Sequence, residues 1–240
     1  MSSAPTADLA RELDVLLHTH LAETRDEAAY CQNVVGMSPL DYLEERGWVE
    51  GRTWLAHGIH FDDVEATRLG AAGVSVSSCS HSNMTLASGI CPICDLEKAG
   101  VGIGLGVDGS ASNDASNMIE EVRQAFMLQR LRYGSANVTD TDAIRWATEG
   151  SVRCLNRNNI GRIATGLQAD FALFKLDEMR HSGHDDPLAA LVICGANRAD
   201  CVMVDGQWRV EQGQIVGLDV QGLIARHATA AANLRQSAGL

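Results

Sequence analysis

The stretch Leu-Asp-Val-Leu-Leu-His-Thr-His-Leu-Ala-Glu, residues 13–23, decides how the chain folds. The run from Leu13 to Thr19 is apolar enough to predict a β-strand, and it ends in a cluster of polar side chains. In an extended strand His18 and His20 point to the same side, and the chain then carries Glu23 to the rim of the sheet. Polar side chains at the carboxyl end of a strand are typical of active sites in β/α barrels.

Short apolar strands alternate with amphipathic helices outward from this stretch. The expected strands are at 54–57, 74–77 and 101–107, and the expected helices are at 26–35, 39–46, 62–70, 96–99, 117–133, 140–148 and 151–155. The helix over 117–133 is the clearest, because Met118, Val122 and Phe126 share one face, and Asp114 or Ser116 is expected to cap it. This alternation predicts a parallel sheet built from β/α units.

The pattern changes near residue 159. Residues 170–174, 201–204 and 207–210 have strand composition, and Val-Asp-Gly-Gln at 204–207 is typical of a hairpin turn. A helix is expected from Leu218 to the end of the chain. We therefore expect two domains, an α/β domain over 1–158 and a β-rich domain with a terminal helix over 159–240.

Composition narrows the class of protein. The 240 residues are 45% hydrophobic and 21% charged, which is typical of a globular protein, and the formal net charge is −12. That charge argues against nucleic acid or an anionic membrane as a partner, since both favour basic surfaces. We expect a cytoplasmic protein, because the first residues lack the features of a signal peptide and the seven cysteines, an odd number, are expected to be reduced.

Three polar clusters follow predicted strands. The first holds His18, His20 and Glu23, and two imidazoles with a carboxylate suit a divalent metal such as zinc. The second, His-Gly-Ile-His, begins at His57, and the third, Gly-Val-Asp-Gly-Ser-Ala-Ser-Asn-Asp, contains Asp108. The alternatives are a polar strand end without a ligand, a structural histidine and an ordinary turn. The order of the clusters on successive strands favours a shared site.

Taken together, these motifs resemble a known family. His-Leu-Ala-Glu-Thr, Leu-Ala-His-Gly, Ser-Asn-Met and Gly-Val-Asp-Gly-Ser-Ala-Ser-Asn are similar to the second half of the amidohydrolase superfamily barrel, in the branch of guanine, chlorotriazine and 8-oxoguanine deaminases. Leu-Ala-Ser-Gly-Ile-Cys, Glu-Val-Arg-Gln-Ala and Leu-Gln-Arg-Leu-Arg-Tyr-Gly point to the 8-oxoguanine group. The resemblance, from about His18 to His227, implies an α/β fold: strands five to eight of a (β/α)8 TIM-type barrel, followed by part of a small β-sandwich domain.

The resemblance implies a role for each of four residues. His20 would be a metal ligand, and Glu23 would shuttle a proton to a ring nitrogen of the substrate. His57 would hold the attacking water or hydroxide, while Asp108 would bind the metal and accept a proton from the water. The cofactor implied is one divalent metal, zinc, and the reaction is hydrolysis of a carbon–nitrogen bond in a cyclic amidine, with release of ammonia. The implied substrate is 8-oxoguanine or a related amino-purine or pterin.

Two departures from the family bear on activity. Family members carry a His-x-His pair on the first barrel strand, and here the His-Leu-Ala-Glu motif stands close to the first residue. We therefore expect an open sheet edge, an incomplete ligand set and an inactive or weakly active isolated chain. Such a chain would form a homo-oligomer or need a partner supplying the missing N-terminal half. In addition, Ser78 and Ser80 replace the histidine and proline of the family motif, a change expected to alter substrate recognition, and His81 is displaced.

Other motifs are expected to be structural. Cys91 and Cys94 form a Cys-x-x-Cys pair without a second pair of ligands, so packing is favoured. The polar group of His181, His184, Asp185 and Asp186 is expected to be a solvated loop. Two functional alternatives remain open: a non-catalytic fragment that folds with a partner, and a hydrolase of amine- or chlorine-substituted triazines.

Overall fold

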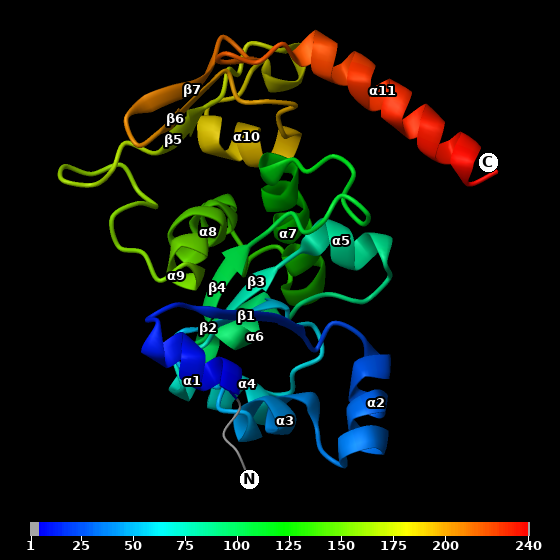
Figure 1. Ribbon diagram of the computed structural model, residues 1–240. Coiled ribbons are helices and arrows are strands. Elements are labelled where there is room, and N and C mark those ends of the chain that lie inside the picture. Colours follow the sequence, from blue (N-terminus) through cyan, green and yellow to red (C-terminus); the bar gives the residue numbers. More distant parts are fainter. Residues whose placement is uncertain (1–4, 240) are drawn as a thin grey trace. The chain divides into compact units, whose positions relative to one another are not determined.

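A computed structural model describes residues 5–239 and divides the chain into two compact units (Figure 1). The first unit contains the residues up to Leu167 together with Leu176–Asn197, and the second contains Gln168–Lys175 and the residues from Arg198 onward. This division differs from the single boundary expected between residues 158 and 159. The reason is that the segment Leu176–Asn197 returns to the first unit. It carries helix α10 (Pro187–Cys194), which packs against α7 (Met118–Tyr133) and α8 (Asp140–Arg145) and buries Val192 completely.

The first unit is built on the expected parallel sheet. Its order is β1-β2-β3-β4, formed by β1 (Leu17–Leu21), β2 (Thr53–His57), β3 (Ser75–Ser78) and β4 (Gly102–Leu105). The first strand begins at Leu17 rather than at the expected Leu13, because an unexpected helix, α1 (Pro5–Glu12), precedes it. Ala7 and Ala10 of that helix pack with Leu17, and this cluster anchors the start of the strand.

The helices of the first unit follow from local signals. Asp62 and Glu65 form a capping box at the start of α4 (Asp63–Ala71), and Ser38 caps α3 (Pro39–Glu45). Asn117, rather than Asp114 or Ser116, caps α7, with its side chain accepting a hydrogen bond from the Ile119 N–H. The remaining elements are α2 (Arg25–Val35), α5 (Ser80–Thr85), α6 (Ile93–Lys98), a π-helix η1 (Trp146–Gly150), α9 (Ser151–Cys154) and a 3₁₀ turn η2 (Met179–His181).

The two faces of the parallel sheet differ in character. Leu55, Val76 and Ile103 are in register on one face and are buried in the core beneath the helices. Ala56 and Ser77, also in register, line a cavity on the opposite face. Burial of a leucine or valine side chain stabilises a fold by about 1.5–3 kcal/mol. The helix-covered face therefore holds the sheet together, which leaves the other face available for polar groups.

The sheet is open in the part of the chain that the structure describes, as expected from the sequence. β1 and β4 are its edges, but the edge of β4 is covered locally. The Leu105 N–H donates a hydrogen bond to Ser151 Oγ, which in turn lies 3.1 Å from the Leu105 carbonyl oxygen. Gly150 permits this approach, because a Cβ atom there would lie 1.9 Å from the carbonyl oxygen of Ile103.

The second unit contains an antiparallel sheet. Its order is β5-β6-β7-β8, formed by β5 (Phe171–Leu173), β6 (Cys201–Val204), β7 (Gln207–Glu211) and β8 (Gln214–Ile215). The expected hairpin turn is present, with Asp205 and Gly206 both at positive φ, as a type I′ turn requires. A long helix follows, α11 (Val220–Ser237). Within residues 5–239, no helix combines the length and apolar character that a membrane span requires.

Candidate active site and metal centre

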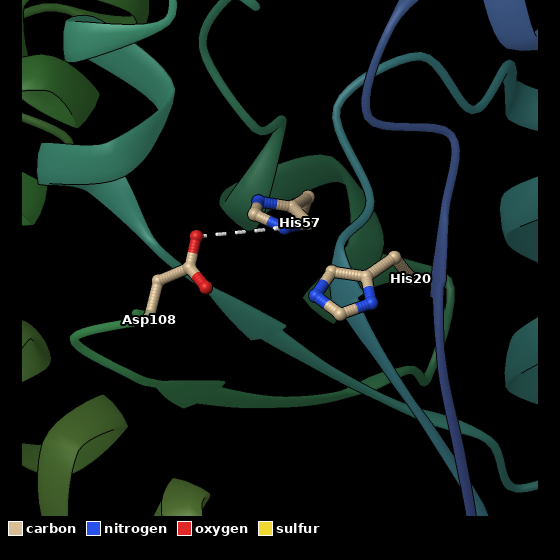
Figure 2. Close-up of side chains that lie close together, drawn as sticks. All are labelled: His20, His57 and Asp108. Atoms are coloured by element: carbon tan, nitrogen blue, oxygen red, sulfur yellow. Dashed lines mark ion pairs between the residues drawn. The ribbon is translucent and has the colours of Figure 1, made fainter. Parts of the chain in front are cut away.

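Three predicted site residues converge at the carboxyl ends of the parallel strands. His20 lies on β1, His57 ends β2, and Asp108 follows β4. One possible ligand atom from each lies within 4.8 Å of the others, and among the described residues no other group of three His, Cys, Asp or Glu side chains does so. Figure 2 shows the Asp108 carboxylate directed at the His57 ring, with the His20 ring beside it. The two ring centroids are 5.2 Å apart, and His57 Nε2 lies 3.9 Å from Asp108 Oδ2.

Backbone conformation brings His57 into this group. Leu55 belongs to the helix-covered face and Ala56 to the cavity face, so a fully extended strand would place His57 on the helix side. Instead His57 has a φ of 71° and Asp108 a φ of 63°. A non-glycine residue in this region costs about 1–3 kcal/mol and persists where its surroundings determine it. The packing around the cluster therefore holds two of its residues in a disfavoured backbone conformation.

Glycine makes the turn after His57 possible. Gly58 has a φ of 59°, and a Cβ atom there would lie 2.7 Å from Cγ1 of the buried Val76. Any other residue would need this core contact to shift as well as adopting a disfavoured backbone conformation. The His-Gly pair is therefore part of how the site is built.

Glu23 lies next to His57 at the edge of the cluster. Its Oε2 atom is 3.6 Å from His57 Nε2, and its side chain remains partly exposed. The backbone N–H of Glu23 donates a hydrogen bond of 3.1 Å to Glu27 Oε2. Glu27 was not singled out from the sequence. Burial raises the pKa of its carboxyl group, and its spacing of one helical turn from Glu23 was the available signal.

Asp108 is held by three donors. Ser82 Oγ donates to its Oδ2 at 2.5 Å, the Gly109 N–H donates to its Oδ1 at 2.7 Å, and Ser112 Oγ lies 3.3 Å from Oδ2. Burial acts to raise the pKa of Asp108, but these hydrogen bonds, led by that of Ser82, lower the pKa below its usual value. The carboxylate is therefore ionised at neutral pH and ready to serve as a ligand or a base.

A cavity of about 250 Å³ opens beside this cluster. His18 and Trp54 form one wall, with ring centroids 3.5 Å apart and planes inclined by 16°. Ser77 and Cys79 also line the cavity, whereas Ser78 is buried and does not. Ser78 therefore makes no direct contact with the cavity that would support its expected effect on substrate recognition. A largely apolar cavity with a few convergent polar groups is typical of a small-molecule site.

Several other sequence motifs lie outside the site. Cys91 is buried, and burial raises the pKa of its thiol to about 12, as suits a packing role. His81 contacts Gln124 rather than the cluster. The expectation that His181 lies in a solvated loop was wrong. The turn η2 buries it, and its Nε2 lies 3.1 Å from the carbonyl oxygen of Gly195.

The donor set fits a divalent metal of the zinc type. Catalytic zinc sites commonly use three protein ligands drawn from imidazole nitrogen and carboxylate oxygen. His20 and Asp108 provide one imidazole and one carboxylate of such a set, with His57 close to both, and the hydrogen bonds to Asp108 provide the outer support that metal ligands usually have.

Comparison with known proteins shows the family to which the chain belongs. Residues 5–209 match the amidohydrolase family. The 8-oxoguanine deaminase of Pseudomonas aeruginosa is 59% identical over 229 residues, which are 95% of this chain and 51% of that enzyme. The chain thus spans about half the length of the curated relatives it matches.

Two solved structures are also similar to the chain. An adenosine deaminase from Xanthomonas campestris with bound zinc superposes with a TM-score of 0.92 at 30% identity, over 97% of this chain and 54% of that one. An atrazine chlorohydrolase from Arthrobacter aurescens TC1, complexed with zinc, gives a TM-score of 0.88 at 32% identity, over 94% of this chain and 51% of that one. The resemblance found in the motifs is confirmed, and the chain belongs to the amidohydrolase family.

Proposed function

We propose that this chain supplies catalytic groups of a metal-dependent aminohydrolase acting on 8-oxoguanine or a related amino-purine or pterin. The observation that carries the proposal is the convergence of His20, His57, Asp108 and Glu23 beside one cavity. Identity of 59% to an 8-oxoguanine deaminase supports the substrate class. The reaction replaces the exocyclic amino group of the ring with the oxygen of water and releases ammonia.

His20 and Asp108 would hold a zinc-type cation, with His57 beside them. When bound, such a cation supplies Lewis acidity that makes water nucleophilic near neutral pH.

The chain's own side chains divide the proton transfers. His57 Nε2, which faces both carboxylates, orients the attacking water. Asp108, ionised because of its lowered pKa, accepts a proton from that water. Glu23 delivers a proton to the ring nitrogen next to the carbon under attack. The proton held by Asp108 then passes to the amino group, which leaves as ammonia, and the hydroxyl proton of the intermediate returns to Glu23 as the carbonyl group forms. Glu23 and Asp108 lie 3.6 and 3.9 Å from His57 Nε2, so the three side chains can act on the same substrate carbon.

A triazine hydrolase is the second candidate. It is supported by the likeness to atrazine chlorohydrolase at 32% identity and to hydroxydechloroatrazine ethylaminohydrolase at 36%. The higher identity to a purine deaminase favours the first candidate.

Assembly is part of the proposal. The open edges at β1 and β4 are the places where further strands would complete a barrel, supplied by a second copy of the chain or by a separate N-terminal polypeptide. By the same reasoning, the antiparallel sheet of the second unit would be one layer of a β-sandwich.

The test is release of ammonia from 8-oxoguanine by the purified chain with zinc, alone and with a polypeptide corresponding to the N-terminal half of the Pseudomonas relative. We expect release that is abolished by Asp108→Ala and retained by Asp114→Ala, which changes an exposed carboxylate of the same loop. Hydrolysis of a triazine without turnover of 8-oxoguanine would establish the second candidate. Absence of any turnover in the complemented, zinc-loaded protein would contradict both and favour a non-catalytic fragment.

A further inference from the structure

Helix α5 presents two consecutive side chains to the catalytic cluster. Ser82 donates to Asp108 Oδ2, and Asn83 lies with its Oδ1 atom 2.8 Å from His57 Nδ1. Both α5 residues are fully buried. Neither was assigned a role from the sequence, although both lie in the Ser-Asn-Met motif. A single short helix therefore contacts two members of the cluster.

The contact with Asn83 determines which ring nitrogen of His57 carries the proton. A carboxamide oxygen only accepts hydrogen bonds, so this contact requires a hydrogen on Nδ1. In a neutral imidazole the Nε2 atom is then left with its lone pair free. Nε2 is the nitrogen that faces Glu23 and Asp108, at 3.6 and 3.9 Å. We propose that Asn83 is a positioning residue that holds His57 in the Nδ1–H tautomer, with the Nε2 lone pair directed into the site.

The opposite tautomer is what the site would otherwise favour. Two carboxylates face Nε2, and carboxylates attract an N–H donor. The hydrogen bond from Nδ1 to Asn83 is shorter and buried, so it opposes that attraction. With its lone pair free, Nε2 can accept a hydrogen bond from the attacking water and so orient it.

Glu121 keeps Asn83 in place from outside the cluster. Its carboxylate accepts hydrogen bonds from the backbone N–H groups of Ser80 and His81, the first two residues of α5, and that from His81 measures 3.2 Å. Glu121 is fully buried on α7. The backbone N–H of Asn83 donates to the Cys79 carbonyl oxygen at 2.9 Å, which fixes the start of the helix to the end of β3. The Asn83 side chain thus has little freedom to leave His57.

The test is two-bond ¹H–¹⁵N NMR of the full chain labelled in its eight histidines, with His57→Gln used to assign the signal. We expect the Nδ1–H pattern for His57 in the parent. In Asn83→Leu, which keeps the size of the side chain but removes the acceptor, we expect the Nε2–H pattern, because the two carboxylates then dominate. Asn83→Asp, which restores an acceptor, should restore the Nδ1–H pattern.

The matched control is Gln124→Leu, which removes the other carboxamide–imidazole contact near α5, to His81 at 2.9 Å. It should change the His81 signal and leave that of His57 unchanged. An Nε2–H pattern in the parent, or an unchanged His57 pattern in folded Asn83→Leu, would overturn the proposal. The catalytic meaning of the tautomer rests on the proposed deaminase function. The spectrum needs no turnover, so failure of the function and failure of this inference are observed separately.

Discussion

The two units of the chain differ in what they bury. The first unit has a core of fully buried side chains, among them Leu55, Leu69 and Val76, and every residue of the candidate site belongs to it. Among the described residues of the second unit, no side chain is buried, and α11 exposes Leu223, Ile224 and Leu234. A sheet without a buried core has little stability of its own. The comparison indicates that the candidate site lies in the unit that has a well-packed core.

The largest expected effect separates the cores of the two units. Leu55→Ala should lower the free energy of unfolding of the first unit by about 2–5 kcal/mol, because it creates a cavity in a fully buried position. Leu223→Ala, on the exposed face of α11, should change the free energy of unfolding by less than about 0.5 kcal/mol. Denaturant titration followed by circular dichroism measures both. Equal losses in the two variants would show that α11 is buried in solution.

The next effect concerns the metal centre. Asp108→Ala should weaken zinc binding at least about 100-fold, because it removes one of the two proposed ligands, His20 and Asp108. Ser82→Ala, which removes only the hydrogen bond to that carboxylate, should weaken zinc binding about 10-fold. Competition with a chromogenic chelator gives the two affinities. Unchanged affinity in Asp108→Ala would place the metal elsewhere.

The sequence could predict the parallel sheet and point to all four residues of the cluster, because the polar groups stand at or near the carboxyl ends of apolar strands and their order resembles a known family. It could not reveal the direction of His57, since that depends on a positive φ stabilised by packing around Gly58. Helix α5 was missed for a related reason. Its sequence, Ser-His-Ser-Asn-Met-Thr, is poor in strong helix formers, and its cap, Glu121, comes from a segment 41 residues away from Ser80. Long-range caps and strained turns leave no local pattern.

A smaller effect depends on pH. Burial is the largest influence on Glu121 and raises its pKa from 4.5 to about 7, despite the hydrogen bonds from Ser80 and His81 that lower it. The folded state therefore binds the proton more tightly than the unfolded state. Its contribution to stability is fully present below pH 4.5 and is lost as the pH rises through about 7.

Glu121→Gln should remove this dependence. Between about pH 5 and about pH 8 the parent should lose about 1–3 kcal/mol more than the variant in the free energy of unfolding. Urea titrations at the two pH values supply the comparison. A difference between parent and variant that does not change with pH would show that Glu121 is ionised throughout.

The smallest expected effect compares two glycines at positive φ. Gly58→Ala combines this backbone conformation with a clash against Val76, whereas Gly217, in the second unit, has a φ of 75° and no heavy atom within 4 Å of the position that a Cβ would take. We expect Gly217→Ala to cost about 1 kcal/mol and Gly58→Ala about 1–2 kcal/mol more. Thermal unfolding of both variants measures the difference. Equal effects would mean that the contact with Val76 relaxes freely.

The hydroxyl of Ser151 gives the two sheet edges different accessibility. On β4 it already occupies both the N–H and the carbonyl oxygen of Leu105, so an incoming strand would have to displace it before pairing there. Within the sheet, β1 pairs only with β2, so its other side is the second edge. The two edges therefore differ, because pairing at Leu105 on β4 would first require the loss of both hydrogen bonds to Ser151.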